Sequence, residues 1–135
     1  MRLVDTNVIV RYVLGDARDP KTALAIDFIE RQCSAERPGL VTSVVLVELV
    51  WVLGSRYRLK KRGIVAAIDA LVQNANLQLD SEDELLAALD AYREYAVDFA
   101  DCLIAARANA LGISAATFDR RAARLSPFQL LQTGS

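Results

Sequence analysis

Short aliphatic segments alternate along this chain with longer segments of helical periodicity, and this alternation restricts the fold more than any other feature. The aliphatic segments predict β-strands and the periodic ones predict helices. The predicted strands cover residues 2–4, 40–42, 77–79, 113–117 and 128–131. The predicted helices cover residues 7–14, 22–33, 43–53, 63–75, 81–97 and 98–111. Strands that alternate with helices favour a parallel sheet covered by helices on both faces. We therefore predict an α/β fold, a single three-layer α/β/α domain over residues 1–135 with a central, mostly parallel sheet of four or five strands.

Composition supports one ordinary domain and excludes several classes of protein. A chain of 135 residues with 53% hydrophobic residues can bury a substantial core. Its net charge of −1 gives no overall attraction to nucleic acid or membrane, so any polyanion must bind a local patch. Cys33 and Cys102 are far apart in the sequence and predict free, buried thiols of a reducing compartment. The longest apolar stretch, 40–53, is too short to span a bilayer, so we expect a cytoplasmic protein with no membrane partner.

Four acidic residues adjoin or interrupt apolar runs: Asp5, Glu48, Asp101 and Asp119. Burial of a carboxylate is costly unless a positive charge offsets it. Ligands of open α/β sheets gather at the carboxyl ends of the strands, where we expect Asp5 and Asp119. Asp101 falls in the first turn of a predicted helix, and Glu48 falls in the second turn of another if Ser43 is its cap. Both helices are expected to begin at that same edge of the sheet. The sequence therefore predicts that all four carboxylates meet at one rim of the sheet.

Each acid also has a plainer explanation when it is taken alone. Asp5 is able to cap the following helix, and Asp119 is able to occupy an ordinary turn. Asp101 stands three residues after Asp98, as in a capping box, and for Asp98 capping is the favoured interpretation. Glu48 is harder to explain in this way, because its apolar neighbours leave few solvated helix faces. The nearby Trp51 is more typical of a core than of a partner groove.

A cation site would explain the four acids together. Four ionised carboxylates repel one another unless divalent cations bind. The chain contains no histidine, which removes Ser-His triads and the commonest general base. Oxygen-only ligands select hard ions, Mg²⁺ or Mn²⁺, which retain water that is able to act as a nucleophile. Metal ions held by acids suit displacement at phosphorus, so phosphodiester hydrolysis is the predicted reaction class.

The same residues resemble a known family. The segment Asp5-Thr6-Asn7-Val8-Ile9, Glu48 in a mid-chain helix, the segment 99–106 around Asp101, and Thr117-Phe118-Asp119 look like the motifs of the PIN-domain nucleases. The length and the order of the motifs look most like the VapC-type toxins of toxin–antitoxin pairs. The resemblance covers nearly the whole chain, and it is specific because four motifs occur in order.

The resemblance implies an activity and a set of roles. It implies that Asp5, Glu48, Asp101 and Asp119 are the catalytic, Mg²⁺-binding acids, and that Mn²⁺ is able to replace Mg²⁺. It implies that Thr6 and Thr117 orient the carboxylates and that Asp98 is an auxiliary acid. The implied function is magnesium-dependent endoribonuclease cleavage of RNA by the toxin of a type II pair. The implied partners are a cognate antitoxin and a second copy in a homodimer.

Two other functions remain open from the sequence. One is a receiver-like signalling domain that binds Mg²⁺ around a phosphorylatable aspartate, although the lysine that such pockets need is absent beyond Lys61. The other is a catalytically inactive PIN-like module that binds RNA or a protein.

The basic run 56–62 is either a solvated connection or a contact for RNA or the antitoxin. Basic residues also follow Asp119, and they are either solvated or able to steer a phosphate: Arg120, Arg121 and Arg124.

Overall fold

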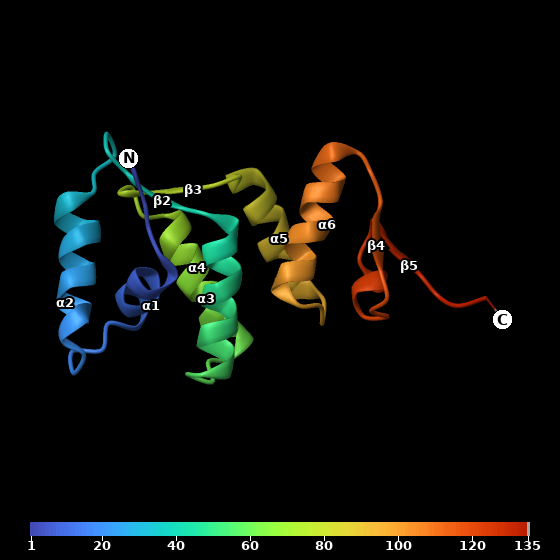
Figure 1. Ribbon diagram of the computed structural model, residues 1–135, viewed down its shortest axis with the longest axis horizontal. Helices are drawn as coiled ribbons and strands as arrows, with labels where there is room; N and C mark the ends of the chain where they lie inside the picture. Colours follow the sequence, from blue (N-terminus) through green and yellow to red (C-terminus); the bar gives the residue numbers. More distant parts are fainter. Residues whose placement is uncertain (135) are drawn as a thin grey trace. The chain divides into compact units, whose positions relative to one another are not determined.

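The computed structural model describes residues 1–134, so Ser135, the last residue of the predicted domain, lies outside the described residues. The chain divides into two compact units, Met1–Asp80 and the segment that begins at Ser81. Figure 1 shows the helices and strands of both. Each unit combines parallel strands with helices, which confirms the predicted α/β class.

Three parallel strands form the sheet of the first unit, in the order β1-β2-β3. They are β1 (Arg2–Leu3), β2 (Gly39–Val41) and β3 (Leu77–Leu79). Arg2 lies opposite Gly39, which in turn lies opposite Leu77. The central strand β2 is packed so closely that a Cβ atom at Gly39 would lie 2.8 Å from Cγ2 of Val4. This close approach requires glycine.

The helices of the first unit begin and end at residues with recognisable local chemistry. They are α1 (Thr6–Leu14), α2 (Pro20–Asp27) with the π-helical turn η1 (Phe28–Gln32), α3 (Ser43–Ser55) and α4 (Lys61–Val72). Asp5 caps α1, and Gly15 ends it in the left-handed conformation with φ 59°. Asp19 caps α2 ahead of Pro20. Thr42 caps α3 and accepts a hydrogen bond from the Val45 amide, so Ser43 is the first residue of the helix and not its cap.

The core of the first unit lies between the sheet and these helices. Its members are aliphatic side chains, as expected for a layer of strands covered by helices. The fully buried ones are Ile9, Ile29, Val41, Leu46, Leu49, Leu53, Ile68 and Leu71. Leu46, Leu49 and Leu53 follow the spacing of one helix face, so α3 is fixed to the core along its length.

The second unit contains two packed helices and two parallel strands. They are α5 (Glu82–Glu94), α6 (Phe99–Leu111), β4 (Ala115–Thr117) and β5 (Phe128–Leu130), with the 3₁₀ turn η2 (Ala122–Arg124) between the strands. The rings of Tyr92 and Phe99 meet edge to face, with centroids 5.5 Å apart. Gly112 ends α6 with φ 68°, as its position in the sequence predicts.

The strands match the predicted number and direction, with one difference in their grouping. All pairings within residues 1–134 are parallel, and they form a three-stranded sheet in the first unit and a two-stranded sheet in the second. The sequence Ser81-x-x-Glu84 is typical of a capping box, and Ser81 does occupy the N-cap position of α5. Ser81 precedes α5 with a positive φ of 53°, and its side chain makes no cap hydrogen bond within the described residues.

Two further expectations concern the cysteines and the bilayer. Cys33 and Cys102 are both buried and free, which confirms the prediction of free thiols. In residues 1–134, every helix falls short of the length and apolar character that a bilayer crossing requires.

Candidate metal centre

Asp5 stands at the carboxyl end of β1, where the predicted fold places a ligand site. Its backbone is extended, and its Oδ1 accepts a hydrogen bond of 2.7 Å from the amide of Thr6. The side chain is exposed, and the helix cap uses only its Oδ1. Capping and ligand binding are therefore compatible at Asp5 and need not be alternatives.

Thr6 connects Asp5 with Glu48. The Thr6 hydroxyl donates a hydrogen bond of 3.0 Å to Oε1 of Glu48, across 42 positions of sequence. Thr6 is only 9% exposed, so this hydroxyl is fixed by its surroundings. The two acids lie on neighbouring elements, because Asp5 begins α1, which packs against α3 (Figure 1). One threonine thus positions two of the four predicted carboxylates through its amide and its hydroxyl.

The expected burial of Glu48 is wrong. Helix α3 buries Val45, Leu46 and Leu49 and leaves Val44, Glu48 and Trp51 exposed on the other side. Trp51 is 63% exposed, so its predicted core position is also wrong. The apolar run misled because it covers more than one face of the helix, and only one face contacts the core.

Asp101 and Asp119 lie close together in the second unit. Asp101 lies in the first turn of α6 and is half-buried, and Asp119 follows β4. The pKa of the Asp101 carboxyl is raised above its usual value, mainly by burial and further by the charges of Asp98 and Asp119. Asp98 holds the N-cap position of α6, but within residues 1–134 its side chain makes no cap hydrogen bond. Asp98 therefore occupies the predicted cap position without making the side-chain hydrogen bond of a cap.

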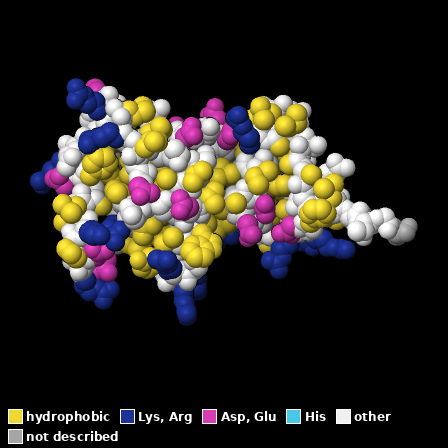
Figure 2. All heavy atoms as spheres, viewed as in Figure 1, with side chains coloured by type: hydrophobic (Ala, Val, Ile, Leu, Met, Phe, Trp, Pro, Cys, Tyr) yellow, Lys and Arg dark blue, Asp and Glu magenta, His cyan; other side chains and the backbone are white. Residues whose placement is uncertain are grey.

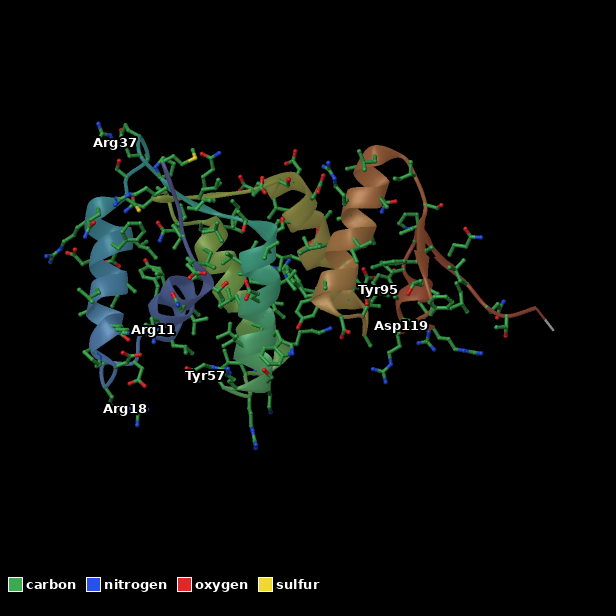
Figure 3. The ribbon with its side chains drawn as sticks, in the orientation of Figure 1. Arg11, Arg18, Arg37, Tyr57, Tyr95 and Asp119 are labelled. Carbon is green, nitrogen blue, oxygen red and sulfur yellow. The ribbon has the colours of Figure 1, made fainter. Side chains whose placement is uncertain are left out.

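Asp119, which is labelled in Figure 3, orders the turn that carries it. Its amide donates to Oγ1 of Thr117 at 3.0 Å, and its Oδ1 accepts from the amide of Arg121 at 2.7 Å. This pattern is an Asx turn followed by the short helix η2. The amides of Arg121 and Ala122 both donate to Oδ1 of this exposed carboxylate.

The donor chemistry of these residues fits a hard divalent cation. All four predicted ligands are carboxylates, and within residues 1–134 none forms an ion pair in its own unit. Their negative charge is therefore uncompensated, which favours binding of Mg²⁺ or Mn²⁺. No group of three or more Cys, Asp or Glu side chains in the described part of the chain is close enough to hold a metal ion. Asp5 is joined with Glu48 in one unit, and Asp101 with Asp119 in the other.

Two residues of interest were missed by the sequence analysis. Asp80 follows β3 as Asp5 follows β1, and the segment Leu77-Gln78-Leu79-Asp80 repeats the signal of an acid at a strand end. Phe118 lies beside Asp119 and is 81% exposed. The sequence signal that could have identified Phe118 is an aromatic residue that directly follows a predicted strand and lies in a polar turn.

Comparison with known proteins gives three findings. The model of the PIN domain family matches residues 2–126. A protein named VapC ribonuclease from Aquifex aeolicus is 24% identical over 126 residues, which are 93% of this chain and 92% of that protein. The solved structure of VapC20 from Mycobacterium tuberculosis, described as a sarcin–ricin loop cleaving toxin, aligns with a TM-score of 0.43 and 19% identity. That alignment covers 93% of this chain and 95% of that one.

Proposed function

Because this chain belongs to the PIN domain family, we propose that it is a magnesium-dependent endoribonuclease and the toxin of a type II toxin–antitoxin pair. The similarity to a protein named VapC ribonuclease supports ribonuclease activity. The proposal includes an RNA substrate, a cognate antitoxin, a homodimer and a cytoplasmic location. It also treats residues 1–135 as one functional domain.

The hydrogen bond between Thr6 and Glu48 is the observation that carries the proposal. It ties a carboxylate from the middle of the chain to Thr6, the residue that directly follows Asp5. Asp101 and Asp119 add a second pair of acids, because burial and the charges of Asp98 and Asp119 raise the pKa of the Asp101 carboxyl. We propose that these four residues are the metal-binding acids of one catalytic centre.

The chain supplies ligands and orientation in this proposal. Thr6 holds Glu48, and Thr117 fixes the turn that carries Asp119. A bound divalent cation would stabilise charge that develops on the phosphodiester and would activate water. Arg120 and Arg121, both exposed beside Asp119, are placed to attract the RNA backbone.

The test is RNA cleavage by the Asp5→Asn variant. Asparagine caps helices about as well as aspartate, so α1 keeps its cap while the site loses a charge. We expect the wild type to cleave RNA with Mg²⁺ or Mn²⁺ and to stop when a chelator is added. We expect Asp5→Asn to lose cleavage and growth inhibition with an unchanged circular dichroism spectrum. Asp16→Asn is the matched control, because Asp16 is an exposed acid that pairs with Arg18 and should be dispensable.

The outcomes separate the competing functions. Undiminished cleavage by Asp5→Asn would overturn the metal mechanism. RNA binding by a wild type that never cleaves, with or without metal, would identify an inactive PIN module. Stable aspartyl phosphorylation by a small phosphodonor would instead favour the receiver-like function. Relief of growth inhibition by a co-expressed, co-encoded partner tests the toxin role.

A further inference from the structure

Phe118 is the most exposed large hydrophobic side chain in residues 1–134, with 81% of its surface accessible. Exposure of one hydrophobic residue is ordinary, but a whole aromatic ring in water forgoes a large burial energy. Phe118 also directly precedes Asp119, one of the four proposed metal ligands. A ligand that covered the Phe118 ring would therefore lie beside this proposed metal ligand.

The turn that carries Phe118 is ordered on both sides of the ring. Before it, the carbonyl of Thr117 accepts a hydrogen bond of 2.7 Å from the amide of Leu131. After it, Asp119 is fixed by Thr117 and by the amide of Arg121. Ala122, fully buried, anchors the far end of the turn. The ring is thus presented by a rigid support, which reduces the entropic cost of binding a partner.

The charges around Phe118 favour a nucleic acid over a protein. Arg120 and Arg121 follow the ring and are both exposed, and Arg124 is exposed one turn later. Acidic and basic side chains lie among hydrophobic ones near the β4–β5 end in Figure 2. A ring beside guanidinium groups offers stacking for a base and attraction for a phosphate, which is how single-stranded nucleic acids are bound without base pairing.

We infer that Phe118 is a stacking platform for an unpaired nucleobase of the RNA, next to the phosphate that is cut, with Arg120 and Arg121 holding the backbone beside it. This inference rests on the proposed ribonuclease function and deepens it, because it names unpaired RNA as the substrate class. A base in a duplex is stacked on its neighbours and cannot cover the ring, so paired RNA is bound more weakly.

The experiment measures binding of RNA to the full chain that carries Asp5→Asn, so that RNA stays intact. The probe is a single-stranded oligonucleotide with 2-aminopurine at successive positions, and its duplex is the comparison. Phe118→Ala is expected to raise Kd by about 5- to 150-fold, the usual range for loss of one stacked base. It should also abolish the 2-aminopurine fluorescence change at one position. Phe118→Trp should bind within about threefold of the parent, because it retains a stacking surface.

Ile113→Ala is the matched control. Ile113 is 56% exposed and precedes β4, at the end of the strand opposite Phe118. Its truncation removes a comparable exposed apolar side chain from the same unit, and Kd should stay unchanged. Equal effects of Phe118→Ala and Ile113→Ala on Kd would overturn the stacking role.

The remaining outcomes distinguish this inference from the proposed function. If the wild type cleaves RNA and Phe118→Ala alters only self-association in sedimentation, the ring belongs to a protein interface and the inference fails alone. If stacking is observed but the wild type never cleaves, the nuclease proposal fails and the platform remains. If the chain neither binds nor cleaves RNA, both fail.

Discussion

At the scale of single residues, Thr6 is the most informative side chain in the molecule. It is nearly buried, yet its two donors serve acids that face solvent. A hydroxyl this buried needs a hydrogen-bond partner inside the protein, and Glu48 supplies it. This bond restricts the rotamers of Glu48 and holds one oxygen of that acid at Thr6, the residue after Asp5. Restriction of this kind is what a metal ligand needs before the ion arrives.

Replacement of Thr6 tests this positioning role. Thr6→Val keeps the shape and the branching of the side chain but removes the donor to Glu48. We expect a 10- to 100-fold loss, roughly, in metal affinity or in the rate of RNA cleavage, as is usual for groups that orient metal ligands. Thr6→Ser keeps the hydroxyl and should restore the Mg²⁺ dependence of the rate. A Mg²⁺ titration curve for Thr6→Val that overlays the wild type would contradict the role.

At the scale of elements, the three strands of the first unit are short, so close packing between them matters. The central strand β2 begins at Gly39, where Val4, Leu77 and Cys33 surround the space that a side chain would need. At Gly54, in helix α3, a Cβ atom would have room, because the nearest atom is the end of the Ile64 side chain at 3.7 Å. A methyl group is therefore crowded at Gly39 and fits in ordinary contact at Gly54.

Alanine at each glycine gives a matched prediction for stability. Gly39→Ala should lower the free energy of unfolding by about 1–3 kcal/mol, because its methyl group overpacks the sheet against β-branched Val4. Gly54→Ala should raise it by roughly 0.5–1 kcal/mol, because alanine restricts the unfolded chain and favours the helix. Urea denaturation followed by circular dichroism measures both values. A stabilised Gly39→Ala variant would show that β2 is packed more loosely than described.

Local signals predicted the elements well where the chain carries its own start and stop residues. Asp5 and Gly15 bound α1, and Gly112 ends α6, as their chemistry indicates. The wrong predictions concern features that depend on tertiary packing, which local sequence patterns do not contain. The apolar run around Glu48 could not reveal which face of α3 meets the core. The sequence Ser81-x-x-Glu84 resembles a capping box, but the positive φ of Ser81 turns its side chain away from that role.

At the scale of the whole molecule, the net charge does not indicate a function, whereas the local distribution of charge is informative. The chain carries −1 overall, but a single exposed acid, Asp119, is followed directly by the exposed Arg120 and Arg121. The order of strands and helices allowed the α/β class to be predicted, whereas the meeting of all four acids at one rim stays a prediction. Sequence alone could not assign the exposed ring of Phe118, because accessibility depends on the turn that carries it.

Titration with Mn²⁺ tests whether the four acids form one centre. A paramagnetic ion broadens the NMR signals of nearby amides, so each bound site is identified by the residues that disappear. If one centre is shared, amides near Asp5 and Glu48 and those near Asp101 and Asp119 should broaden together with one apparent Kd. Removal of a single ligand by Asp5→Asn should then weaken broadening around Asp101 as well, while Asp16→Asn should leave both regions unchanged. Two independent Kd values, with broadening near Asp101 untouched by Asp5→Asn, would show separate sites and refute a shared catalytic centre.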